Sequence, residues 1–75
     1  MKTVNKIKVS PKAWNTTVFF EDGSKDVIPF ENFLRCFNDW RKAVLEYMMY
    51  IYAKAGNHEI AMKAINEIKR KLLPS

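Results

Sequence analysis

The chain has 75 residues and a mass of 8.8 kDa, which is enough for one small domain and too little for two. Hydrophobic residues make up 48% of it and charged residues 28%, a balance that excludes a disordered chain and predicts a folded globule. Thirteen Lys and Arg residues against eight Asp and Glu give a net charge of +5, which favours acidic partners such as nucleic acid or anionic protein surfaces.

The cysteine content and the N-terminal sequence both bear on the cellular compartment. Cys36 has no second cysteine with which to form an intramolecular disulfide, so a reducing, cytoplasmic setting is expected. Residues 1–6 do not enter the apolar stretch of a signal peptide. The longest uncharged apolar run, residues 47–53, is far shorter than the roughly 18 to 20 residues that cross a bilayer, so no membrane span is expected.

Residues 1–28 are predicted to form a β-sheet, and residues 2–10 are its first strand. Apolar and polar residues alternate there, which turns Ile7 and Val9 inward and the lysines outward. Val4 breaks this alternation.

Two more strands are predicted after Pro11, which interrupts the first. Residues 14–20 are rich in Thr, Val and aromatic residues and indicate the second strand. Asp22 and Gly23 then predict a hairpin turn, because glycine tolerates the positive φ of tight turns. A loop of two residues and one of three to four both fit, so the register and the inward face of the third strand stay open.

Residues 29–55 predict one long amphipathic helix that begins at Pro29. Its apolar residues recur at spacings of three and four, which places them on one stripe at 100° per residue. The stripe consists of Phe30, Phe33, Leu34, Phe37, Trp40, Val44, Leu45, Met48, Ile51, Tyr52 and Ala55. A kink or short break near residues 36–38 is compatible with this pattern.

A second helix is predicted over residues 57–73. Gly56 is suited to end the first helix, Asn57 to cap the second, and Pro74 to close it. The connection is so short that the two helices must run antiparallel. The predicted fold is therefore α+β: a three-stranded antiparallel sheet, built as a meander, followed by an antiparallel two-helix hairpin packed on it.

The segment YAKAGNHEIAMKAINEIKRKLLP resembles single repeats of the tetratricopeptide and pentatricopeptide families. Tyr52, Gly56, Ala61 and Pro74 stand at about the offsets of those repeats. The resemblance implies helical-hairpin geometry. It carries no function, because such repeats stack in roughly three copies and this chain has one hairpin after a sheet.

No residue constellation predicts catalysis, and no enzyme activity, cofactor, metal or small-molecule substrate is expected. Cys36 and His58 could in principle pair as nucleophile and base. The helix between them separates them by about 28 Å at 1.5 Å per residue, so they are predicted to be structural. Glu21, Asp22 and Asp26 lack the spacing of a calcium loop.

Residues 47–53 are apolar around nearly the full circumference of the predicted helix. Such a helix is buried on more than one side, and Tyr and Met are favoured at protein interfaces. We therefore expect a small non-enzymatic regulator or inhibitor that binds a protein partner and self-associates as a dimer. The candidate partner-binding residues are Tyr47, Met49, Tyr50 and Ala53. Partial exposure without a partner is the alternative.

The alternative function is nucleic-acid binding by a basic strand face. Residues 1–12 contain four lysines and no acidic residue, and a fifth lysine could join them across the sheet. The candidate residues are Lys2, Lys6, Lys8, Lys12 and Lys25, with Trp14 as a stacking ring. The same lysines could instead only keep the sheet edge from aggregating.

Overall fold

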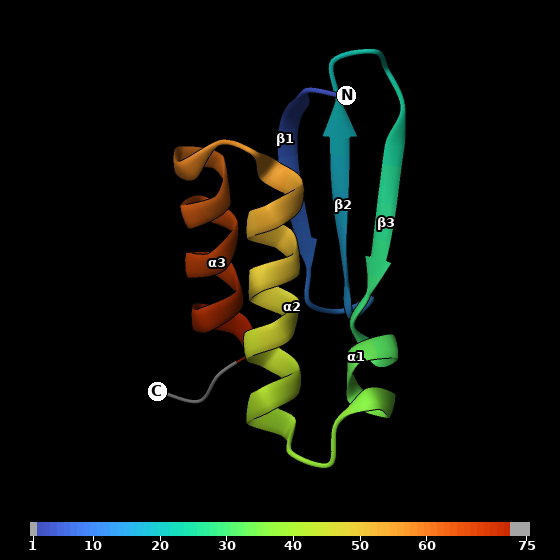
Figure 1. The fold of residues 1–75 in the computed structure, drawn as a ribbon, viewed down its shortest axis with the longest axis vertical. Coiled ribbons are helices and arrows are strands. Elements are labelled where there is room, and N and C mark those ends of the chain that lie inside the picture. The colour runs from blue at the N-terminus through green and yellow to red at the C-terminus, as the bar shows by residue number, and fades with distance from the viewer. Residues whose placement is uncertain (1, 73–75) are drawn as a thin grey trace.

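The computed structural model describes residues 2–72, which form a sheet followed by helices (Figure 1). The sheet is antiparallel with strand order β1-β2-β3, and its strands are β1 (Val4–Ser10), β2 (Asn15–Phe20) and β3 (Lys25–Pro29). The helices are α1 (Phe30–Cys36), α2 (Trp40–Ala55) and α3 (His58–Leu72). The predicted α+β class is thus confirmed. Leu73 and Pro74, the predicted end of the second helix, lie outside the described residues.

The helix predicted over residues 29–55 is divided into α1 and α2, and the break at residues 37–39 overlaps residues 36–38, where the sequence pattern was compatible with one. Phe37 ends α1 in an extended conformation (φ −129°, ψ 138°). Asp39 begins α2, where its carboxylate accepts a hydrogen bond from the Arg41 N–H at 2.9 Å. This N-cap lets a new helix start with its own direction and rotational phase.

The new phase changes which residues of α2 enter the core. The buried residues are Ala43, Val44, Tyr47, Met48, Ile51 and Ala55. Leu45 and Tyr52, which a single stripe would bury, are exposed, and Tyr47 is buried in the core. The predicted stripe failed at these positions because it carried the phase of α1 across the break.

A β-bulge explains why Val4 breaks the alternation of β1. The pairing register with β2 shifts between Val4 and Lys6, so Asn5 is an extra residue in β1. The bulge returns Val4 to the face that carries Ile7, and Val4 is buried in the core there.

The hairpin predicted at Asp22 and Gly23 is present, and residues 21–24 form its loop. The Phe20 N–H donates to the Ser24 carbonyl at 2.9 Å, and Gly23 has a φ of 88°. This loop length pairs Phe19 with Lys25.

The two long helices form the predicted antiparallel hairpin, side by side in Figure 1. Gly56 ends α2 with a φ of 60°, the left-handed conformation that favours glycine. The Asn57 Oδ1 accepts hydrogen bonds from the N–H groups of Glu59 and Ile60 at 2.9 and 3.3 Å. Both helix ends are therefore built by the residues that the sequence indicated.

The helices cover one face of the sheet, here called the inner face. Val4, Val18 and Ile28 contribute to one hydrophobic cluster with residues of α2 and α3. Tyr47 lies at the centre of this packing, and its hydroxyl forms hydrogen bonds with the Thr16 Oγ1 (2.5 Å) and the Ile28 carbonyl (3.1 Å). Thr16, itself fully buried, thereby has its hydroxyl satisfied.

Candidate functional site

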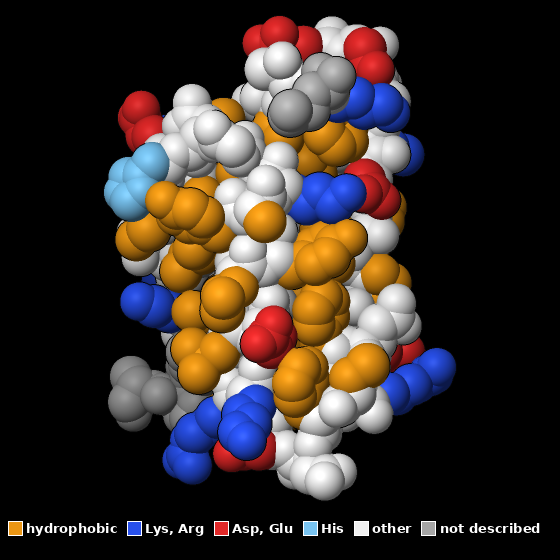
Figure 2. All heavy atoms as spheres, viewed as in Figure 1, with side chains coloured by type: hydrophobic (Ala, Val, Ile, Leu, Met, Phe, Trp, Pro, Cys, Tyr) orange, Lys and Arg blue, Asp and Glu red, His pale blue; other side chains and the backbone are white. Residues whose placement is uncertain are grey.

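Exposed apolar side chains gather on α2. Four of the six large hydrophobic residues that are exposed within residues 2–72 belong to this helix. They are Leu45 (56% exposed), Met49 (64%), Tyr50 (42%) and Tyr52 (45%). We name these four residues, with the exposed Ala53, the α2 surface. Figure 2 shows the corresponding face of the molecule, where hydrophobic side chains extend along much of its length.

The structure keeps three of the four predicted partner-binding residues at the surface and removes one. Met49, Tyr50 and Ala53 are exposed. Tyr47 is 1% exposed and cannot touch a partner, because its ring and hydroxyl are used inside the protein.

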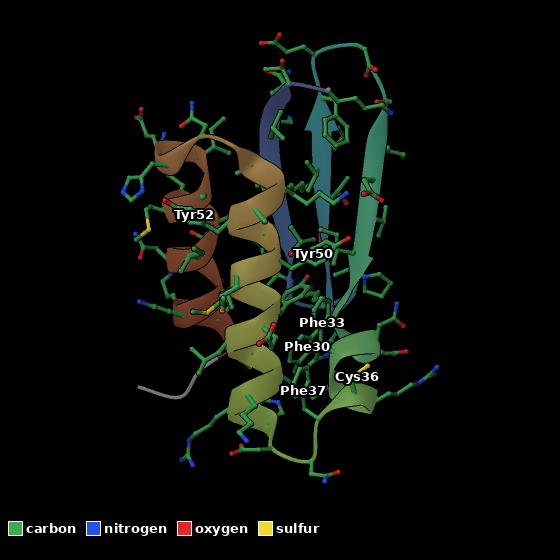
Figure 3. The ribbon with its side chains drawn as sticks, in the orientation of Figure 1. Phe30, Phe33, Cys36, Phe37, Tyr50 and Tyr52 are labelled. Carbon is green, nitrogen blue, oxygen red and sulfur yellow. The ribbon has the colours of Figure 1, made fainter. Side chains whose placement is uncertain are left out.

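The α2 surface has two sides. In Figure 3, Tyr50 lies on the side of α2 toward the sheet and Tyr52 on the side toward α3. The Tyr50 ring packs edge-on against Phe33 of α1 at 5.6 Å, and the Lys54 ammonium lies 5.6 Å from its centroid. Tyr52 lies on the side of α3, with its hydroxyl 3.0 Å from the His58 Nδ1. Tyr50 is therefore partly engaged within the chain.

Leu45, Met49 and Tyr52 form one exposed stripe, of which only Met49 was predicted to lie at the surface. Their spacing of four and three residues places them on one side of the helix. The signal was present in this spacing, but Leu45 and Tyr52 were assigned to the core stripe and only Met49 to the partner-binding surface.

A second candidate surface is the outer face of the sheet, opposite the helices. Lys6 pairs with Phe19, and Phe19 pairs with Lys25, so the three residues form one row across the strands. Lys8, Thr17 and Val27 form the next row on the same face. The structure thus brings together three of the five predicted lysines, and it adds Phe19 as an aromatic neighbour.

The remaining residues of the predicted basic face lie elsewhere. The Lys2 ammonium donates to the Ser24 Oγ at 3.0 Å and lies over Phe20, which belongs to the inner face. Lys12 lies in the turn between β1 and β2.

Trp14 does not join the basic face either. Its ring stacks on the buried Phe30 ring, with centroids 5.3 Å apart, and its carbonyl accepts the Phe30 N–H at 2.9 Å. These contacts hold Trp14 at a φ of 52°, which is unusual for a residue with a side chain. Trp14 therefore anchors the start of α1.

Cys36 and His58 lie at opposite ends of α2. Cys36 is the exposed last residue of α1, and His58 is the exposed first residue of α3. The 16 residues of α2 between them span about 24 Å, so the two side chains do not meet.

A shallow pocket of about 570 Å³ lies where β1 and the end of α2 meet. Both lysines that line the pocket already have partners within the chain. Lys54 lies 3.3 Å from the Asp26 carboxylate, and Lys2 donates a hydrogen bond to Ser24. Within residues 2–72, no group of three His, Cys, Asp or Glu side chains could hold a metal ion. None of the helices in this range is long and apolar enough to span a membrane.

Comparison of the chain with protein-family models, with curated proteins and with solved structures found no match. The α2 surface and the outer face of the sheet are the features from which a function can be argued.

Proposed function

We propose that this protein is a non-enzymatic interaction protein of regulator or inhibitor type, which binds protein through the α2 surface. The observation that carries this proposal is the exposed stripe of Leu45, Met49 and Tyr52. Complete burial of such a side chain from full exposure is worth about 1.5 to 3 kcal/mol, and because these three are 45 to 64% exposed, a partner that covers them would gain about half of this for each. A helix stripe at this spacing is suited to pack against another helix.

The first partner that we propose is a second copy of this chain. Leu45 lies four residues before Met49 and Tyr52 three residues after it. In an antiparallel pair of α2 helices, Met49 would face its own copy and Leu45 would face Tyr52 of the other chain. The stripe is thus nearly self-complementary, as a twofold interface requires. A cytoplasmic setting belongs to the same proposal, because Cys36 is free and exposed.

Sedimentation of the purified chain at low micromolar concentration tests the proposal. We expect a dimer, and we expect Met49→Lys to weaken it about 100-fold, because the central residue is lost from both copies. Val27→Lys is the matched control, since it places the same charge on an exposed apolar residue of the sheet. It should leave the dimer intact.

A wild-type chain that stays monomeric at about 100 µM would overturn the proposed self-association, as would a Met49→Lys variant that remains folded and dimeric. A photo-crosslinker in place of Met49 provides the second measurement. A product of twice the 8.8 kDa chain mass supports the second copy as the occupant, and a product with any other protein contradicts it.

A further inference from the structure

Among residues 2–72, no helix covers the outer face of the sheet, which is basic and carries the half-buried ring of Phe19. Lys6, Lys8 and Lys25 are exposed there, and Val27 is 46% exposed. The Lys6 ammonium lies 5.1 Å from the centroid of the Phe19 ring. Because neighbouring strands are about 4.8 Å apart, the backbones of Lys6 and Lys25 flank Phe19 at about 10 Å from each other.

The three strands contain one acidic residue, Asp26, and it does not lie on the outer face. Asp26 of β3 pairs with Val18 and so belongs to the inner face, where its carboxylate lies 3.3 Å from the Lys54 ammonium. Glu21 and Asp22 lie in the loop at the end of the sheet, and hydrogen bonds from Ser24 lower the pKa of the Asp22 carboxyl. The residues paired across the outer face include three lysines and no acidic residue.

We infer that the outer face of the sheet binds single-stranded nucleic acid, with Phe19 stacking on a base and Lys6, Lys8 and Lys25 contacting phosphates. A polyanion complements the charge of the face, and single strands add bases that stack on aromatic rings. This surface is distinct from the α2 surface, so the two proposals stand or fall separately.

The chemistry of the face also predicts how selective the binding is. Lysine is a point charge without the planar fork with which arginine reads guanine, and the face has no arginine. Phosphate contacts and stacking carry little base information, so binding is largely independent of sequence. Three phosphate contacts predict that log Kobs falls with log salt at a slope of about −2.

Fluorescence anisotropy with labelled oligothymidine and oligouridine of about 12 nucleotides, a length within the known site sizes, tests the inference at about 50 mM salt. The variant carries Lys6→Gln, Lys8→Gln and Lys25→Gln, which lowers the net charge from +5 to +2. We expect it to bind about 100-fold more weakly and to lose the salt slope. The control makes the same change of charge on exposed lysines of the helices, through Lys42→Gln, Lys63→Gln and Lys69→Gln.

Phe19→Leu removes the ring and keeps an apolar side chain. It should weaken binding about tenfold with little change in the salt slope, and Phe19→Trp should restore it. Circular dichroism and thermal melts verify that each variant is folded.

Four results would overturn the inference. They are the absence of binding below about 100 µM, an equal loss in the control variant, tighter binding to a duplex of the same sequence, and equal binding to polyglutamate. The last result would mean that the face recognises acidic polymers in general, because polyglutamate has charge and no bases.

Discussion

The inner and outer faces of the sheet are made of alternate residues of the same strands, yet their chemistry is opposite. Thr16 and Val18 of β2 point to the inner face and are fully buried. Thr17 and Phe19 point to the outer face, in rows that contain the exposed lysines. Neighbouring residues of β2 therefore have different structural roles, because successive side chains of a strand point alternately to the core and to the solvated surface. Burial, more than residue type, decides what each contributes.

The largest expected difference in unfolding free energy between a core position and the outer face is between two phenylalanines, Phe30 and Phe19. Phe30 is 0% exposed, with its ring between those of Trp14 and Tyr47 at centroid distances of 5.3 and 5.0 Å. Phe30→Ala should cost about 3 to 5 kcal/mol, comparable with the whole stability expected of so small a chain. Phe19→Ala, on the outer face, should cost about 1 kcal/mol. Urea unfolding measures both, and equal losses would contradict the assignment of Phe19 to an uncovered face.

Two neighbouring threonines give a narrower comparison. Thr16→Val keeps the shape of the side chain and removes the hydroxyl that bonds to Tyr47, whose own hydroxyl keeps the Ile28 carbonyl as a partner. We expect a loss of about 1 to 2 kcal/mol. Thr17→Val should change the free energy of unfolding by less than about 0.5 kcal/mol. A Thr17 effect as large as that of Thr16 would indicate that the outer face is packed against something.

The third test uses pH. Burial raises the pKa of the Tyr47 hydroxyl above its ordinary value of 10.0. Near pH 10 the Tyr47 hydroxyl loses its proton in the unfolded chain but keeps this proton in the folded protein. The free energy of unfolding therefore falls as the pH rises above 10.0. The slope from this group is at most about 1.4 kcal/mol per pH unit. Tyr47→Phe should flatten the decline, and an unchanged decline would assign it to other groups.

The sequence alone determined the features that depend on neighbouring residues. The glycine of the hairpin, Gly56 at the end of α2 and the Asn57 cap were predicted from residue type and position, since each acts within about one turn of backbone. The alternation of β1 placed Lys6 and Lys8 on the solvent side for the same reason. The sheet, the helical hairpin and part of both candidate surfaces followed from such local signals.

Tertiary structure decided the features that depend on contacts between distant parts of the chain. The hydrogen bond between Tyr47 and Thr16, 31 residues away, accompanies the rotational phase of α2 that buries this tyrosine. The same rotational phase of α2 leaves Leu45 exposed. The hairpin register likewise placed Lys25 beside Phe19. Phase and register are collective properties, because one residue of shift moves every side chain to another face, and only packing selects among the alternatives.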